Sequence, residues 1–139
     1  MTVTVTVLGT QCTDGETAHT RVTAVGTLQR QGQACRLTYE EPATADTPAA
    51  TTAIVILPHH VTIHRKSDTQ SRLTLETDHT HRCPYHTPYG TLTLAVTAHT
   101  IKNELFTPAG RLFLTYSLDM GSGDAIQHTI EIFVKEVSS

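Results

Sequence analysis

The segment that decides the interpretation of the whole chain is Pro84-Tyr85-His86-Thr87-Pro88-Tyr89-Gly90-Thr91-Leu92-Thr93-Leu94. Pro84 and Pro88 each hold φ at about −65° and lack a backbone N–H, so we expect a kinked loop through which no β-ladder runs. After Gly90, residues 91–96 alternate between polar and apolar, which is typical of a half-buried strand. The segment therefore predicts a loop that ends at Gly90 and a strand that continues to about Leu105.

The same alternation recurs along most of the chain and predicts an all-β protein. Threonine, a β-branched residue that favours strands, is by far the most frequent residue. Turns rich in Gly, Pro, Asp and Ser separate the apolar-alternating segments. The predicted strands span residues 3–7, 17–29, 35–41, 53–57, 61–66, 72–76, 90–105, 112–120 and 126–134. Eight or nine strands without a helix predict one domain over residues 1–139, an antiparallel up-and-down barrel, because closure removes exposed edges. A two-sheet sandwich is the alternative.

The composition argues against several classes of function and cellular setting. The formal net charge is −3, the ten Lys and Arg residues are scattered, and nucleic-acid binding needs clustered basic residues. Three cysteines at unrelated spacings do not form a disulfide framework, so we expect reduced thiols and a cytoplasmic protein. The N-terminus has the pattern of a first strand and not of a signal peptide, and no apolar run approaches membrane-spanning length. A monomer or a homodimer is expected.

Several short motifs, in order, carry a resemblance to a known family. They are Gly26 before a hairpin, Leu37-Thr38-Tyr39-Glu40-Glu41, Val61-Thr62-Ile63-His64-Arg65, Ser71-Arg72-Leu73-Thr74-Leu75-Glu76 and Thr87-Pro88-Tyr89-Gly90-Thr91-Leu92. In these the chain resembles the YwiB-like family of small bacterial β-barrel proteins. The resemblance implies a lipocalin-like, calycin-type barrel with a lumen open at one end, and structural roles for Gly26, Pro88, Tyr89 and Gly90. The family has no assigned activity, so no catalytic residue is carried over.

The sequence departs from the family pattern at two places. Ser67-Asp68 stands where the family usually has a glycine, and the segment Asp78–His86 is enriched in His and Cys. In an extended segment His79, His81 and Cys83 point the same way, so two imidazoles and a thiolate could converge on a zinc-like ion, with His86 nearby. The spacing is not that of a usual zinc module, and Pro84 precedes His86. We therefore favour the interpretation that this segment is an exposed polar loop, and we expect no cofactor. His59-His60 reads as a turn.

A second set of candidates follows from strand parity. On strands whose inward face is otherwise apolar, the alternation also turns a few polar and aromatic residues inward: Tyr39, Glu41, Arg65, Tyr116 and His128. A charge that faces a barrel interior must be paired or solvated. Glu41 and Arg65 are the candidate pair. They form either an ion pair at the barrel mouth reached by water, or part of a lumen that orients a ligand through a few polar groups.

These observations leave three hypotheses for the function. We expect a non-enzymatic binding module that holds a small, partly apolar or anionic molecule in the lumen. The first alternative is a metal-dependent enzyme or a metal-binding protein that uses the Asp78–His86 corner. The second is a structural barrel that acts through protein contacts or dimerises through its threonine-rich outer face. The sequence contains neither a Gly-x-Ser-x-Gly motif nor a phosphate-binding loop, so no motif of these kinds supports catalysis.

Overall fold

The protein is a closed barrel of antiparallel strands. The computed structural model describes residues 1–45, 48–105, 109–121 and 125–137. Within these ranges the strands are β1 (Thr2–Thr13), β2 (Glu16–Gln31), β3 (Ala34–Glu41), β4 (Ala50–Leu57), β5 (His60–Lys66), β6 (Gln70–Glu76), β7 (Thr80–Thr87), β8 (Gly90–Glu104), β9 (Ala109–Asp119) and β10 (Ala125–Glu136). Each strand pairs with its neighbours in sequence, and β1 pairs with β10 to close the sheet. The predicted all-β up-and-down barrel is confirmed, and the sandwich alternative is wrong.

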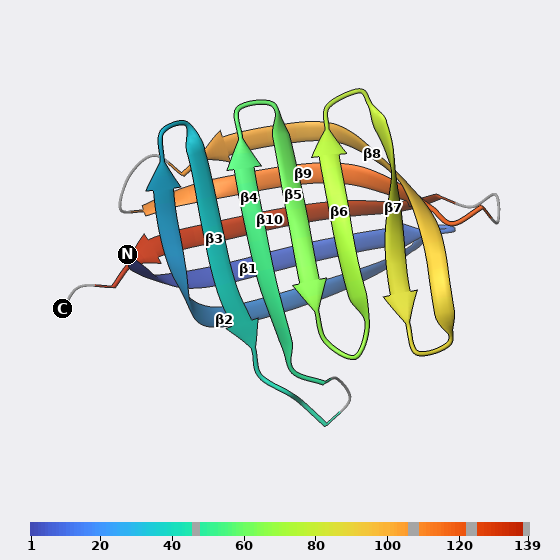
Figure 1. Cartoon of the computed structure of the whole chain (residues 1–139), viewed down its shortest axis with the longest axis horizontal. Coiled ribbons are helices and arrows are strands. Elements are labelled where there is room, and N and C mark those ends of the chain that lie inside the picture. The colour runs from blue at the N-terminus through green and yellow to red at the C-terminus, as the bar shows by residue number, and fades with distance from the viewer. Residues whose placement is uncertain (46–47, 106–108, 122–124, 138–139) are drawn as a thin grey trace.

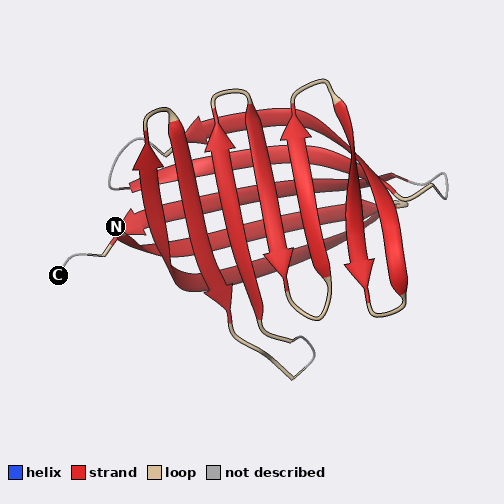
Figure 2. Ribbon diagram, in the orientation of Figure 1, coloured by secondary structure: helices blue, strands red, loops and turns tan. Residues whose placement is uncertain are grey.

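The strands are arranged in two crossing layers. Strands β3–β7 lie side by side in the first layer. Strands β1, β9 and β10 form the second layer, which runs across the first layer behind it (Figure 1). The long strands β2 and β8 belong to both layers. β2 pairs with β1 and then, from Gly26, with β3, while β8 pairs first with β7 and then with β9. Figure 2 shows strand throughout the barrel wall. The described part of the chain contains no helix that could span a membrane.

The strand count is ten among the described residues because the predicted loop around Pro84 is a strand. β7 includes Pro84, which lies opposite Thr93 of β8. In an antiparallel ladder, successive residues direct their N–H groups to opposite neighbours. Thr87 lies opposite Gly90 in the register, and the residues that close a two-residue hairpin are expected to form a hydrogen-bonded pair. Counting back from Thr87, the nitrogen of Pro84 then points away from β8. Proline therefore leaves the β7–β8 ladder intact, and the expectation of a loop was wrong.

The missing N–H of Pro84 affects the other side of β7, where that strand forms a seam with β6, the line of contact between the two strands. The registered pairs of that seam are Gln70 opposite His86 and Ser71 opposite Tyr85. Beyond them the amide of Thr74 donates to the thiol of Cys83 across 3.4 Å, where a ladder would offer a carbonyl. The β6–β7 seam is thus held partly by side chains. Cys12, Cys35 and Cys83 are all free, as predicted.

The centre of the barrel is filled. Inward side chains from almost every strand pack into one core, and many have essentially no exposed surface: Val3, Val5, Leu37, Ile56, Val61, Leu75, Val96, Leu112 and Leu114. A side chain with no accessible surface cannot border a void that admits water. The central lumen implied by the family resemblance is therefore occupied by side chains, and space for a ligand is left only towards the ends.

The motif residues have structural positions. Pro88 and Tyr89 form the β7–β8 turn, where Tyr89 is fully exposed and Gly90 has a φ of 135°. Such a φ favours glycine. Gly26 lies where β2 passes from β1 to β3. A Cβ at Gly26 would lie 2.5 Å from the carbonyl oxygen of Thr38, a backbone atom that cannot rotate away.

We expect Gly26→Ala to lower the free energy of unfolding by about 1–3 kcal/mol, the usual cost of overpacking. Gly9→Ala on β1 is the matched control, because its Cβ would meet the hydroxyl of Thr20 at 2.6 Å, at the end of a side chain that can turn aside. Urea unfolding of both variants measures the difference. Equal losses would contradict the corner role of Gly26.

Candidate functional site

A row of polar and aromatic side chains crosses the inner face of the first layer at one end of the barrel. Tyr39 lies opposite Thr52, Thr52 opposite Arg65, Arg65 opposite Ser71, and Ser71 opposite Tyr85. The row lies near the ends of β3, β5 and β7 and the starts of β4 and β6, which meet at the lower end of the barrel in Figure 1. We call this row, together with Glu41, Tyr116 and His128, the polar mouth.

The charged pair of the polar mouth is Arg65 with Glu41. One guanidinium nitrogen, Nη2 of Arg65, lies 3.5 Å from Oε2 of Glu41. The side chains are 41% and 23% exposed, respectively. The two residues thus lie together as the alternation predicts, and water reaches both. Such half-exposed pairs contribute little to stability, typically about 1 kcal/mol or less.

Below the pair lie two buried hydroxyl groups. Thr52 is 2% exposed, and its Oγ1 has no hydrogen-bond partner. The phenol of the neighbouring Tyr39 is close enough for a hydrogen bond with Thr52 to lower its pKa slightly, but the two groups do not have the distance and angle of a well-formed bond. Burial, reinforced by the Glu41 carboxylate, raises the pKa of Tyr39 to about 12. An unpaired buried hydroxyl costs about 1–3 kcal/mol, so Thr52 is a polar group that a bound molecule could satisfy.

The second layer contributes two stacked rings. The rings of Tyr116 and His128 are parallel, with an interplanar angle of 3° and centroids 5.0 Å apart. Burial raises the pKa of Tyr116, and interaction with Tyr39 adds to this, which places the two phenols near each other in the interior. Burial also lowers the pKa of His128. The five residues predicted to face inward therefore form one continuous series of interactions from Arg65 to His128.

The chemistry available in the polar mouth is that of recognition. A phenol is protonated at neutral pH even at its ordinary pKa of about 10, and the raised pKa values of Tyr39 and Tyr116 move their ionisation still further from that range. They are hydrogen-bond donors and ring surfaces there, and not general bases, which work best with a pKa near the operating pH. Arg65 adds a permanent positive charge. An open hollow of about 370 Å³ lies beside Glu41, and its lining includes Glu40 and Lys66 but no other residue of the polar mouth.

Sequence reasoning did not identify Thr52, Ser71 and Tyr85 as site residues. The sequence predicts that the strand containing Thr52 begins one residue later, and it places Tyr85 in a loop. The alternation of inward and outward residues could have identified Thr52, because it shares the inward face of β4 with Ile54 and Ile56. For Tyr85 the sequence offered none, since proline normally excludes a ladder.

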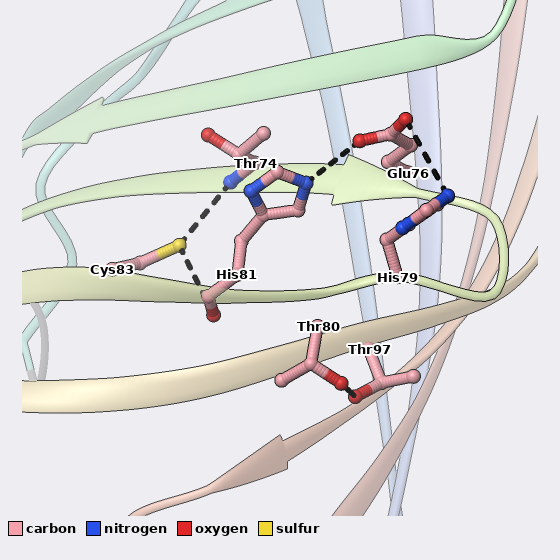
Figure 3. A network of polar contacts seen from close by, with 7 residues as sticks. All are labelled: Thr74, Glu76, His79, Thr80, His81, Cys83 and Thr97. Carbon is pink, nitrogen blue, oxygen red and sulfur yellow. Dashed lines mark hydrogen bonds and ion pairs between the residues drawn. The ribbon is translucent and has the colours of Figure 1, made fainter.

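The His and Cys candidates at the start of β7 do not come together. Nε2 of His81 lies 2.9 Å from one oxygen of Glu76, and Nε2 of His79 lies 3.9 Å from the other (Figure 3). Cys83 is buried, and its thiol contacts the amide of Thr74 and the carbonyl of His81 and not the imidazoles. Within the described ranges, no three His, Cys, Asp or Glu side chains gather in a way that could hold one metal ion.

The side chains of the metal-site alternative are kept apart by local causes. β7 begins at Thr80, so His79 precedes the alternating strand, and the turn before it contains Asp78 with a positive φ of 64°. Where the β6–β7 ladder is incomplete, the thiol of Cys83 accepts a hydrogen bond from the amide of Thr74. His86 interacts with Thr91 of β8 on the exposed surface, 3.0 Å away.

Comparisons with known proteins support the fold. A family described as a domain of unknown function, DUF1934, matches residues 5–132. The chain is similar to the crystal structure of the YwiB protein from Bacillus subtilis, with a TM-score of 0.86 and 18% sequence identity over 99% of this chain and 92% of that chain. At this identity the likeness shows the fold alone. No curated protein matches the sequence.

The Arg65–Glu41 pair can be tested by a double-mutant cycle. Because the pair is half-exposed, Arg65→Ala and Glu41→Ala together should cost less than the sum of the single changes by about 0.5–1 kcal/mol in unfolding free energy. The control cycle combines Arg65→Ala with Glu131→Ala, which removes a carboxylate held by Arg111 and should be additive. Additivity in both cycles, measured by urea unfolding, would show that the inner pair is not coupled.

The Glu76 cluster predicts a pH dependence. The hydrogen bond from His81 is the main cause that lowers the pKa of Glu76. A carboxyl with a lowered pKa in the folded state stabilises the fold above its unfolded pKa, and this contribution is lost as the pH falls through the folded pKa. The stability difference between wild type and Glu76→Gln should therefore shrink as the pH falls below about 5, through and beyond the ordinary titration range of a glutamate. Glu40→Gln, at an exposed position on β3, is the control, and an equal change in both variants would refute the role of Glu76.

Proposed function

The chain belongs to the DUF1934 family, a domain of unknown function, as its resemblance to YwiB-like proteins predicts, and from that premise we propose that it is a non-enzymatic binding module. Its ligand is a small, partly apolar anion that binds in the polar mouth. The observation that carries the proposal is an arginine turned into the barrel, loosely paired, beside a buried hydroxyl that has no partner.

The two layers offer different surfaces to such a ligand. The first layer supplies the polar groups of Tyr39, Thr52 and Arg65. The second layer supplies apolar side chains that face inward, pack against the core and yet stay partly exposed: Val7, Ala24, Leu118 and Ile130. Because the centre of the barrel is filled, the accessible surface of these residues lies towards its ends. A polar wall opposite an apolar wall suits a molecule with one charged end and one apolar body.

Arg65 gives the ligand its sign. A guanidinium recognises carboxylate and sulfonate groups through paired N–H donors. Both phenols and the neutral His128 are uncharged at neutral pH, so Glu41 is the one negative group of the polar mouth and offsets the positive charge only in part, through a single 3.5 Å contact. We propose a cytoplasmic setting for this module, in line with its free thiols.

The two alternatives have less support. No preformed ligand set for a metal exists at the Asp78–His86 corner within the described residues. Dimerisation through the outer face stays a prediction. The large apolar side chains exposed on that face include Val25 and Phe133, which lie opposite Thr4 and Thr6 of β1.

Fluorescence titration with 8-anilinonaphthalene-1-sulfonate, an amphipathic anion, tests the proposal. We expect saturable binding that dodecanoate reverses and dodecylamine does not. Arg65→Ala should weaken binding about tenfold or more, because a hydrogen bond to a charged group is worth about 1.5–3 kcal/mol. Arg111→Ala, on the outer face, is the matched control. Equal displacement by the amine, or equal loss in both variants, would contradict an anion site at Arg65.

A further inference from the structure

The two arginine–glutamate pairs of the barrel wall differ in geometry but not in exposure. On the outer face, Nη2 and Nε of Arg111 lie 2.8 and 2.9 Å from Oε2 of Glu131. In the polar mouth, Arg65 reaches Glu41 through one nitrogen at 3.5 Å. The side chains of the outer pair are 36% and 32% exposed, and those of the inner pair 41% and 23%. Because the side chains of both pairs are similarly exposed to solvent, a difference in solvation does not explain the longer contact of the inner pair. Most of the five N–H donors of Arg65 are not used by Glu41.

Glu41 has room to leave Arg65. It is the last residue of β3 and is followed by Pro42, so the strand ladder does not constrain the chain beyond it. Its side chain borders the hollow of about 370 Å³ that Lys66 also lines. The hollow is open, and its lining includes Glu40 as well as Lys66, so a carboxylate that moves away from Arg65 into it meets one charge of each sign. Water then solvates the displaced carboxylate, which offsets part of the cost of breaking the first pair.

We propose that Glu41 is an internal competitor for the anion site: its carboxylate occupies Arg65 in the empty barrel and is displaced by the carboxylate of the ligand. The inference rests on the proposed function and names the ligand class as amphipathic monocarboxylates. The ligand carboxylate lies in the fork of Arg65, within reach of the hydroxyl of Thr52, and its apolar body lies against the inward apolar side chains of the second layer. Glu41 opposes binding twice, by occupying Arg65 and by repelling a like charge.

The competitor role predicts a gain of affinity from a loss of charge. Glu41→Gln keeps the shape of the side chain and removes its charge. It should bind dodecanoate about two- to fivefold more tightly than wild type, because a half-exposed ion pair that need not be broken is worth up to about 1 kcal/mol. Glu131→Gln, which removes the charge of the outer pair, should leave the affinity unchanged. Arg65→Gln should bind weakly, whichever residue stands at position 41.

Displacement of 8-anilinonaphthalene-1-sulfonate by dodecanoate gives the affinities, and Glu41→Ala serves as a second variant if Glu41→Gln melts early. Tighter binding in the Glu41 variants alone supports the competitor. Unchanged or weaker binding in them, with binding in wild type lost in Arg65→Gln, overturns the competitor and leaves the proposed function standing. Absence of binding in every variant, wild type included, overturns both.

Discussion

The ladder between β1 and β10 is the contact on which the rest of the structure depends. It runs from Val3 opposite Glu136 to Cys12 opposite Gln127 and turns a meander of strands into a barrel. Closure leaves each side chain two directions, into the barrel or out to solvent, because side chains alternate along a strand. The inward half must then fill the centre at the density of a protein interior. Polar residues can face inward only where water still reaches, which is at the ends.

The polar mouth is the place where this rule is stretched furthest. Arg65 and Glu41 face inward but remain wet, whereas Thr52 is buried without a hydrogen-bond partner. Burying a hydroxyl in this way lowers stability unless something else satisfies it. The packed core therefore explains the fold. The polar groups beside it that lack hydrogen-bond partners are the reason why we place the ligand in the polar mouth. Tyr39 and Tyr116 connect the two parts, since each has a buried ring and a hydroxyl with a raised pKa.

Strand parity carried most of what could be predicted from the sequence. It places Tyr39, Glu41 and Arg65 inward because their strands alternate without interruption, and inward residues of a closed barrel meet. It failed at Pro84, where the prediction took the missing N–H as a break in both ladders, although an antiparallel strand uses that N–H on one side only. It failed for His79 because the turn at Asp78 interrupts the alternation. The place of the Thr87–Gly90 hairpin decided the first outcome, and the turn at Asp78 decided the second.

The central claim is that the ligand enters at the polar mouth and not at the opposite end of the barrel or on the outer face. Titration of the ¹⁵N- and ¹³C-labelled protein with dodecanoate, followed by NMR, tests it most directly. The account predicts that chemical-shift changes concentrate at Thr52, Arg65 and His128, with the guanidinium signals of Arg65 shifted and those of Arg111 unmoved. Shifts that concentrate instead around Arg30 and Asn103, which line a hollow at the other end, or on the outer face of β10, would contradict it.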